Sequence, residues 1–416
     1  MQEVSEWMKE GSFLHPLGDA NSADLARGVA MAAGVSYESA SQRWGEERMA
    51  HAARLGAEIG DAAHLAYLVL DGLGMNVLSR HLPPTSFLRT HLRRQIRSVF
   101  PATTAAGVTS LTTGDFPSQH GLLGWTVPCR GRLVNPLPFT AEEPRGVSLE
   151  QLGYSPLEVF EGVESMFSMI PRSAKKAFSR YAGTPYTSAT QAMEQHRCSS
   201  SIAGVLDELG RFWRGQAETA PGEASFAYAY IPEPDQTEHE VGFEHERVAA
   251  VLQVLDRALQ RLWDETAHVP GRKLVITADH GHCTLGPTGQ LLMGAEPEDA
   301  ALLACLVHPG GTVEPRSPCF HCRPGKAKEF ANAFRSSRFA AAGFVLLMSD
   351  DVESAGLLGP GPLSPAARAR LGDFMAVTRA GGVIKHGQAS GMVGWHGGGT
   401  PAEVLVPLVV AVGGRG

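Results

Sequence analysis

The chain has few cysteines for its length, and they lie far apart. Six cysteines occur among 416 residues, far below the density of a small domain held together by disulfides. One close pair, in Cys319-Phe320-His321-Cys322, has a zinc-like spacing, but no second pair follows at the distance of a zinc ribbon or finger. We therefore expect free thiols at positions 129, 198, 283, 305, 319 and 322.

Excess positive charge and long apolar runs are also missing. The formal net charge is −7, whereas binding a polyanion depends on lysine and arginine that neutralise its phosphates, so we expect no nucleic acid scaffold as a partner. No apolar run is long enough to cross a membrane. The first residues, MQEVSEWMKEGSF, lack the apolar core of a secretory signal. These features predict a cytoplasmic protein that does not bind membranes.

The composition is that of a folded protein with a substantial core. Hydrophobic residues make up 43% and charged residues 19% of the chain, typical of globular domains. We predict one α/β domain over residues 1–416, built on a doubly wound, mostly parallel sheet flanked by helices. Residues 125–195 and 300–390 interrupt the alternation of strands and helices, and they predict a cap-like insertion and a small α/β insertion.

Several short apolar runs have the character of strands buried on both faces. Helical periodicity separates them, as over residues 102–113 and 246–266. The runs that end close to an aspartate are residues 64–70 before Asp71, residues 226–231 before Asp235 and residues 273–278 before Asp279. Ligands bind at the carboxyl ends of the strands in sheets of this kind, so the three aspartates indicate a functional site.

Histidines accompany these aspartates at spacings that suit metal ligands. His239 follows Asp235 by four residues, which places both on one side of a helical turn. His280 follows Asp279 directly, and His396 lies in the run Gly394-Trp-His-Gly-Gly-Gly399. Mixed carboxylate and imidazole ligands favour Zn²⁺ over Mg²⁺ or Ca²⁺, although Mn²⁺ would fit similar ligands.

A hydroxyl group at the N-terminus of a predicted helix supplies a nucleophile. Thr104 lies in Phe100-Pro-Ala-Thr-Thr104, ahead of an apolar and Thr-rich segment. Unpaired N–H groups and the helix dipole at such a position favour an alkoxide and a bound phosphate. Coordination of the hydroxyl to a metal ion would lower its pKa further.

Together these motifs resemble one known family. Asp71-Gly72 after a strand is followed in order by F-P-x-x-T-x(5)-S-L-T-T-G-x-x-P-x-x-H-G, E-P-D-x-x-x-H, A-D-H-G and a late H-G-G. This arrangement resembles the type I phosphodiesterase and nucleotide pyrophosphatase branch of the alkaline phosphatase superfamily, over residues 64–300 and 390–412.

The resemblance implies a metal-dependent hydrolase with two divalent ions. Carried over by position, Asp71, Thr104, Asp279 and His280 would hold one zinc ion, and Asp235, His239 and His396 the other. Thr104 would attack phosphorus in line and form a phosphothreonine intermediate, while the ions stabilise the attacking and leaving oxygens. The expected substrate is a small phosphodiester or pyrophosphate, with a nucleotide as one candidate.

Two positions depart from the family pattern. Gly107 stands where eukaryotic relatives have an asparagine that contacts a phosphoryl oxygen, and Glu238 replaces a common glycine. Other substrate contacts can be suggested from residue type alone. Trp125 could stack on a base or an aromatic leaving group or pack in the core, and Lys175 and Lys176, with Arg172 and Arg180 nearby, could meet an anionic group or form a solvated face.

Three alternatives remain open from the sequence. A phosphomonoesterase or a phosphonate hydrolase could use the same residues, and a metal-binding module without turnover belongs to another class of function. His386 in Ile-Lys-His-Gly competes with His396 as a ligand, and the glycines beside His396 favour the latter. We expect His120, His245 and His282 to be structural or to support the ligands.

Overall fold

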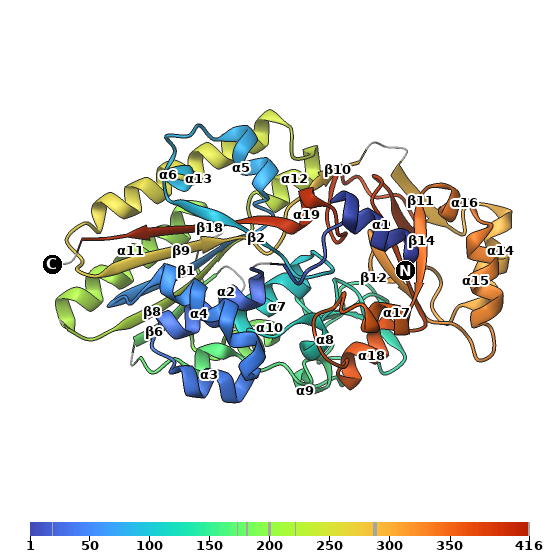
Figure 1. Ribbon diagram of the computed structural model, residues 1–416, viewed down its shortest axis with the longest axis horizontal. Coiled ribbons are helices and arrows are strands. Elements are labelled where there is room, and N and C mark those ends of the chain that lie inside the picture. Colours follow the sequence, from blue (N-terminus) through green and yellow to red (C-terminus); the bar gives the residue numbers. More distant parts are fainter. Residues whose placement is uncertain are drawn as a thin grey trace.

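A computed structural model of the chain is built around one large sheet (Figure 1). It describes residues 1–416 except Asp19, Ser173, residues 180–181, 199–200, Pro221, 286–288 and 415–416. The seven strands lie in the order β2-β18-β9-β1-β8-β6-β7, with β9, β1, β8, β6 and β7 parallel to one another and β18 antiparallel to its neighbours β9 and β2. The fold class predicted from the sequence is confirmed.

The central strands are buried because they carry apolar side chains on both faces. Every residue of β1 and β8 is buried, and the two strands pair in register from His64–Ser225 to Leu70–Ile231. The strands of this sheet are β1 (His64–Leu70), β2 (Leu92–Arg97), β6 (Ala174–Phe178), β7 (Glu194–His196), β8 (Ser225–Ile231), β9 (Arg272–Thr277) and β18 (Leu405–Val412).

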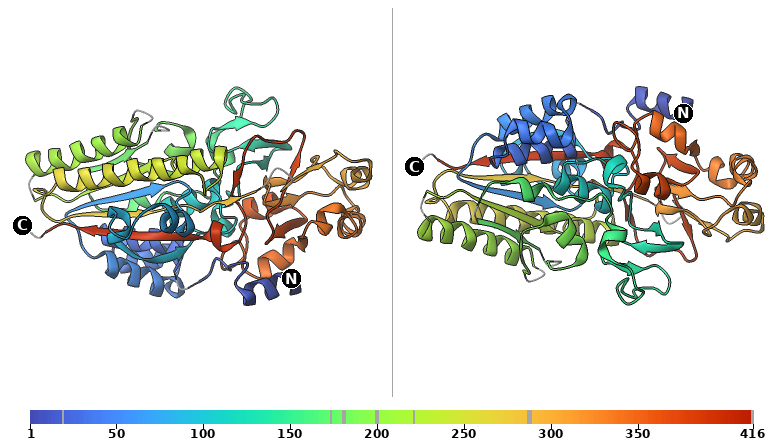
Figure 2. Two further views of the ribbon diagram at one scale, coloured as in Figure 1. Left: turned by 90° about the horizontal axis from the view of Figure 1, so that it is seen from above. Right: turned by 90° about the horizontal axis from the view of Figure 1, so that it is seen from below.

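Helices cover both faces of the sheet (Figure 2). The long helices α11 (Ile202–Thr219) and α13 (Glu246–Glu265) lie on one face, and α2 (Ser22–Ala32), α3 (Tyr37–Trp44) and α4 (Met49–Ile59) lie on the other. Helix α13 packs on the sheet through the apolar stripe seen in the sequence, including Val248, Leu252 and Leu259, which are fully buried. None of the helices in the described part of the chain has the length and apolar character needed to cross a membrane.

The two segments expected as insertions differ in their relation to the sheet. Within residues 125–195, strands β3 (Val127–Cys129), β4 (Arg132–Asn135) and β5 (Thr140–Ala141) form a separate small sheet, whereas β6 and β7 extend the central sheet. Within residues 300–390, β12 (Thr312–Glu314), β13 (Ser317–Phe320), β15 (Phe374–Thr378) and β14 (Phe344–Met348) form an antiparallel sheet, at the right of Figure 1.

Short elements complete the chain. Around the central sheet the remaining helices are η1 (Glu46–Arg48), α5 (Met75–His81), α6 (Phe87–Thr90), α7 (Thr104–Thr113), α8 (Pro117–His120), α9 (Pro156–Val159), η2 (Met166–Met169), α10 (Pro185–Gln191), α12 (Asp235–Val241) and α19 (Pro401–Val404). Beside the small sheet are α1 (Gln2–Glu10), η4 (Pro297–Asp299), α14 (Ala300–Cys305), α15 (Ala327–Arg335), α16 (Arg338–Ala341), α17 (Ser349–Ser354) and α18 (Pro365–Leu371). The remaining strands form two pairs, β10 (Cys283–Thr284) with β17 (Gly394–Trp395) and β11 (Gln290–Met293) with β16 (Val383–His386).

Candidate metal centre and nucleophile

The first group of potential metal ligands lies at the carboxyl ends of β1 and β9. Asp71 follows β1, and Asp279 and His280 follow β9, the neighbouring parallel strand. His280 Nε2 lies 3.3 Å from Asp71 Oδ1 and 3.5 Å from Asp279 Oδ2. All three side chains are almost completely buried. Adjacent strand ends therefore bring two carboxylates and one imidazole to a single point, which we call the first cluster.

Thr104 adjoins the first cluster. It is the first residue of α7, and its Oγ1 lies 3.0 Å from His280 Nε2. Thr103 has extended backbone geometry and precedes the helix, so the Thr104 hydroxyl lies at the helix end where backbone N–H groups are unpaired. The position predicted for the nucleophile thus coincides with the position of the ligands.

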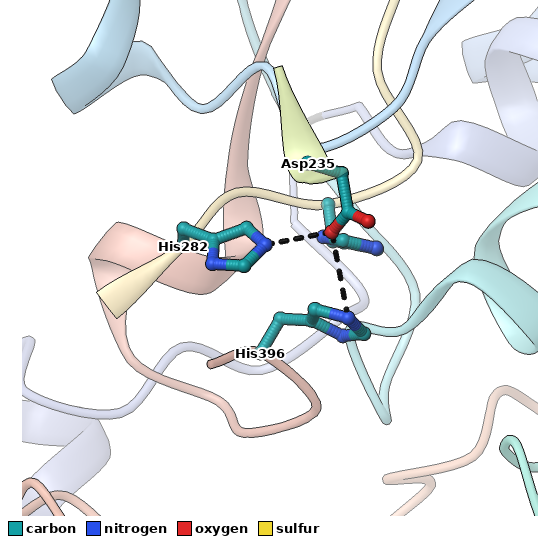
Figure 3. A group of neighbouring side chains, drawn as sticks. Asp235, His282 and His396 are labelled. Atoms are coloured by element: carbon teal, nitrogen blue, oxygen red, sulfur yellow. Dashed lines mark hydrogen bonds and ion pairs between the residues drawn. The ribbon is translucent and has the colours of Figure 1, made fainter. Parts of the chain in front are cut away.

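The second group of ligands surrounds Asp235 (Figure 3). Asp235 and His239 belong to α12, which follows β8, while His282 precedes β10 and His396 follows β17. Asp235 Oδ1 lies 2.7 Å from His282 Nε2, 3.3 Å from His239 Nε2 and 3.6 Å from His396 Nε2. These four residues form the second cluster, in which one carboxylate faces three imidazoles.

The two clusters are contiguous. The rings of His280 and His396 stack with centroids 3.8 Å apart, and His396 Nε2 lies 3.2 Å from His239 Nε2. Ligand atoms of Asp235, His280, His282 and His396 lie within 4.8 Å of one another, as do those of Asp71, Asp279 and His280. His280 therefore joins the two groups into one site.

The charges of the clusters suit divalent cations. Burial, with the nearby charge of Asp235, raises the pKa of Asp71 well above its usual value, and burial also raises the pKa of Asp279. Burial lowers the pKa of His282 to about 4 and the pKa of His396 well below its usual range. Burial opposes ionisation of Asp235, yet the imidazoles around it, His239 first, hold its pKa well below the ordinary value. Buried ionisable groups normally pair with opposite charge or bind a metal.

Several atoms of the two clusters have no hydrogen-bond partner in the described structure. Asp71 Oδ1, Asp279 Oδ2, His282 Nδ1 and His396 Nδ1 are buried and unsatisfied. Such groups are rare in folded proteins unless a ligand or ion satisfies them. The carboxylate oxygens of the two clusters and the imidazole Nε2 atoms that face them fit Zn²⁺ or Mn²⁺ better than Mg²⁺.

A buried ion pair fixes the loop that carries His396. The guanidinium of Arg316, which follows β12, donates hydrogen bonds from Nε and Nη2 to Glu403 at 2.9 and 2.8 Å. Glu403 also accepts the backbone N–H of Gly398, two residues after His396. Both side chains are buried, and burial makes such a bidentate pair sensitive to the loss of either partner. The small sheet thereby positions one ligand of the second cluster.

Gly107 permits close packing of α7 against Asp279. A Cβ atom at Gly107 would lie 2.6 Å from the backbone oxygen of Asp279 and 2.9 Å from its Cβ. The absence of a side chain therefore lets the nucleophile helix approach the ligand strand. The asparagine found at this position in the resembling family has no room here, which explains the departure.

The predicted cationic substrate contacts lie elsewhere. Lys175 and Lys176 are on β6, opposite Phe226 and Ala227 near the start of β8, whereas the clusters lie at its far end. Lys175 Nζ donates to the carbonyls of Phe167 and Ile170, and Lys176 pairs with Glu194. Arg172 binds backbone carbonyls at the same end of the sheet, and Arg180 lies outside the described residues. These cations lie at one end of the parallel strands and the clusters lie at the other, so the cations have structural roles.

Other candidates take structural positions. His386, the competitor of His396, has Nδ1 3.0 Å from the carbonyl oxygen of Met293 and is exposed. His120 is fully buried with Nε2 3.0 Å from Ser110 Oγ, and His245 is an exposed cap of α13. Cys319 and Cys322 are free and belong to no group of three possible ligands among the described residues.

Sequence reasoning did not assign functional roles to two residues of this region. His282 was expected only to be structural or to support ligands, although its place two residues after His280 was a usable signal. Glu314, on β12, accepts a hydrogen bond from Thr103 Oγ1 at 2.6 Å. No signal could have found Glu314, because 210 residues of chain separate it from Thr104 and its own neighbourhood contains no motif.

Known structures share this architecture. Murine ectonucleotide pyrophosphatase/phosphodiesterase 5 is 16% identical, with a TM-score of 0.61 over 83% of this chain and 87% of that chain. The human protein is 15% identical, with a TM-score of 0.61 over the same shares. An inactive murine variant in complex with AMP gives 15% identity and a TM-score of 0.60 over 83% of this chain and 87% of that chain. These TM-scores establish a common fold.

Comparison of the whole sequence with known families agrees with the structural similarity. A search among curated proteins found no match. The profile described as type I phosphodiesterase / nucleotide pyrophosphatase matches residues 65–398, which include every residue of the two clusters and Thr104. The chain is therefore a hydrolase that belongs to the type I phosphodiesterase/nucleotide pyrophosphatase family, whose members depend on metal ions.

Proposed function

We propose that this protein cleaves a phosphodiester or pyrophosphate bond of a small molecule through nucleophilic attack by Thr104. The observation that carries the proposal is the 3.0 Å separation between Thr104 Oγ1 and His280 Nε2, because His280 belongs to the first cluster and also lies beside the second. A hydroxyl placed beside the potential metal ligands is in position to act as a nucleophile. A nucleotide is one candidate substrate, since AMP binds an inactive variant of a structural neighbour.

Two divalent ions, which we propose to be zinc, fit the residues present. Asp71, Thr104, Asp279 and His280 would hold one ion, and Asp235, His239 and His396 the other, with His282 beside Asp235. When bound, such ions offset the buried carboxylates, lower the pKa of a hydroxyl and stabilise charge on phosphoryl oxygens. Manganese would find similar ligands.

The chain itself supplies the nucleophile and an anion-binding helix end. The Thr104 hydroxyl gives up its proton to solvent and its oxygen bonds to phosphorus, while the bond from phosphorus to the leaving oxygen breaks and that oxygen keeps the electron pair. The resulting phosphothreonine still carries the second ester arm. Attack by water on phosphorus then breaks the bond to the threonine oxygen, which regains a proton, and releases the remaining phosphate monoester. The N-terminus of α7 faces the developing negative charge on the phosphoryl oxygens.

The charges around the site favour a diester over a monoester. Within the described ranges, the side-chain hydrogen bonds and ion pairs of the seven metal-ligand candidates run to one another, to His282, to Tyr230 and to backbone groups, and none runs to lysine or arginine. A monoester or a phosphonate carries a second negative charge that no cationic side chain here would meet. A diester carries one negative charge.

Replacing Thr104 tests the proposal. We expect Thr104→Ala, loaded with zinc, to lower kcat for bis-p-nitrophenyl phosphate by about 10³-fold or more, as loss of a covalent nucleophile does. Thr112→Val is a matched control, because the Thr112 hydroxyl on the same helix bonds only to helix carbonyls. Acid quenching of the wild-type reaction, followed by mass spectrometry, should find a p-nitrophenylphosphoryl group on Thr104.

Three outcomes would contradict the proposal. One is an alanine variant that retains its metal and its rate within tenfold of wild type. A second is faster turnover of p-nitrophenyl phosphate or phosphonoacetate than of the diester, which would select the monoesterase or the phosphonate hydrolase. The third is a metal-loaded protein that turns over none of these compounds, which would indicate a binding module.

A further inference from the structure

The N-terminal segment joins the small sheet to the central sheet. Helix α1 lies against one face of the small sheet, where Val4 and Trp7 are buried together with Leu347 and Met375. The chain then crosses to α2, which covers the central sheet (Figure 2). We call residues 2–15 the N-terminal arm. The arm lies before residue 65, where the match to the family profile begins, so its role has to follow from the contacts of this chain.

One residue of the arm contacts the turn before the nucleophile. Phe13 is fully buried, and its ring lies edge-on to the ring of Phe100, with centroids 5.5 Å apart and an angle of 60° between the planes. Phe100 is also buried, and it begins the segment that leads to Thr104 four residues later. Phe13 therefore packs against the turn that places the nucleophile.

The same residue contacts the loop that carries His396. A Cβ atom on Gly399 would collide with Cζ, Cε1 and Cε2 of the Phe13 ring, which are its nearest neighbours. The backbone of Gly399 does not have a positive φ, so the close approach of Phe13 accounts for the missing side chain. The backbone N–H of Leu14 donates a hydrogen bond to the Gly399 carbonyl at 2.7 Å.

The N-terminal arm completes the contacts that hold this loop. Directly after His396, the carbonyl group of Gly397 accepts a hydrogen bond from Ser317 Oγ at 2.6 Å, and the next residue donates to Glu403. The hydrogen bond from Leu14 is the third contact. Three consecutive residues after the ligand are thus each bound by a different segment of the chain.

The N-terminal arm is also fixed on the far side of Phe13. Arg97, the last residue of β2, donates a hydrogen bond from Nη1 to the carbonyl group of His15 at 2.7 Å. His15 Nε2 lies 2.7 Å from the carbonyl oxygen of Ala355, which follows α17. Because both sides of Phe13 are anchored and the interior is close-packed, its ring acts as a rigid spacer between the loop and the turn.

We infer that Phe13 is a positioning residue that sets the separation between the loop of His396 and the turn of Thr104. This inference rests on the proposed two-ion site and adds to it a residue from outside the matched family profile. Phe13 is fully buried, so it acts through the segments that it touches and not on the substrate. Without its ring the loop is free to move, and the second cluster holds its ion less tightly.

Zinc affinity tests this role without any need for turnover. Competition with a zinc chelator measures the affinity for each of the two metal equivalents. We expect Phe13→Ala to weaken one of them by about tenfold, the lower end of the range for residues that orient metal ligands. The weakened equivalent should be the one that Asp235→Asn lacks. Phe339→Ala removes the same side chain from the core on the other face of the small sheet, and it should leave both affinities unchanged.

Gly399→Ala tests the same contact without opening a cavity. Its added methyl group collides with the Phe13 ring, so we expect the second zinc affinity to fall by about tenfold. Phe13→Leu lacks the three ring carbons that collide, yet it keeps most of the apolar volume, and alone it should remain within about threefold of wild type. The double variant Gly399→Ala/Phe13→Leu should therefore bind the second zinc ion more tightly than Gly399→Ala, whereas independent losses would add.

The outcomes separate this inference from the proposed function. Equal zinc affinities in Phe13→Ala and Phe339→Ala, or additive losses in the double variant, overturn the inference, and diester hydrolysis by the same wild-type protein would leave the proposed function intact. If Phe13→Ala does not fold, the comparison of Gly399→Ala with the double variant decides. Zinc affinity that depends on Phe13, in a protein that hydrolyses no phosphorus ester, supports the inference and refutes the proposed function alone.

Discussion

The two ligand clusters are built from different kinds of structure. The first cluster comes from the ends of β1 and β9, paired strands in the middle of the sheet, and combines two carboxylates with one imidazole. The second comes from a short helix and two loops, and surrounds Asp235 with three imidazoles. The first cluster therefore owes its geometry to the sheet, whereas the second depends on contacts between segments distant in the sequence, such as Arg316 with Glu403.

This difference has chemical consequences. Carboxylate ligands suit harder ions, and imidazole ligands favour zinc among the common divalent metals. We therefore expect the second cluster to be the more selective for zinc and the more dependent on a single negative charge. Two experiments test this contrast, and two more test residues outside the clusters.

The largest expected effect is that of Asp235→Asn. Asp235 is the sole carboxylate of the second cluster, so its loss leaves only neutral imidazoles around an ion. We expect one metal equivalent per chain to be lost and kcat/KM to fall by about 10³-fold. In Asp71→Asn, which leaves Asp279 in the first cluster, kcat/KM should fall less. Metal analysis and diester hydrolysis measure both variants, and equal losses would contradict the contrast.

His282→Gln should weaken the second cluster without abolishing it. His282 Nε2 lies 2.7 Å from Asp235 Oδ1, a contact that orients the carboxylate. Loss of such a supporting partner typically lowers metal affinity by about 10–100-fold. Competition with a zinc chelator measures the affinity, and His386→Gln, at an exposed histidine outside both clusters, is the control. An unchanged affinity would show that His282 has no part in holding the metal.

His120 shows the behaviour of a buried imidazole that has no carboxylate beside it. Burial lowers its pKa to about 3, below the value of about 6.5 in an unfolded chain. The folded state therefore excludes a proton that the unfolded state binds, and stability that is present above pH 6.5 is lost as the pH falls toward 3. From this group we expect the free energy of unfolding to fall by about 2 kcal/mol between pH 6.5 and pH 5.

His120→Gln should remove that part of the acid sensitivity. Urea unfolding of the metal-free protein at the two pH values measures it, with the exposed His268→Gln as a control. If wild type and His120→Gln lose equal free energy of unfolding, His120 is protonated in the folded protein and the assignment fails.

Lys175→Ala and Lys176→Ala should have the smallest effect. Both side chains are engaged by Phe167, Ile170 or Glu194 near the start of the strands. We expect kcat/KM for the diester to remain within about twofold of wild type, as for structural residues remote from a site. A rise of KM above tenfold would mean that an anionic substrate group reaches β6.

The sequence predicted the first cluster better than the second. Asp71 and Asp279 end apolar strands, and neighbouring parallel strands meet at one edge of a sheet, so local patterns suffice to bring them together. His239 and His396 were recognised from their motifs. The contribution of Glu314 was out of reach, because it depends on how the small sheet docks against the turn at Thr103.

The substrate contacts were the least predictable part. Lys175 and Lys176 were expected in a cap, yet β6 is a strand of the central sheet. Its two half-buried lysines interrupt the apolar run by which the inner strands were recognised. Gly107 was interpreted as a missing contact, and only the structure reveals the close approach of α7 to Asp279. The local sequence shows which chemistry a side chain is capable of. Whether that side chain contacts a substrate depends on its distance from the site in the folded chain.

The buried Arg316–Glu403 pair limits how the protein can be re-engineered. Because this pair fixes the His396 loop from the side of the small sheet, the insertion is not an exchangeable module. A chimera that grafts the corresponding segment of a relative must carry over a guanidinium at the same place, or Glu403 becomes an uncompensated internal charge. Any alteration of specificity through this segment is therefore coupled to the integrity of the metal centre.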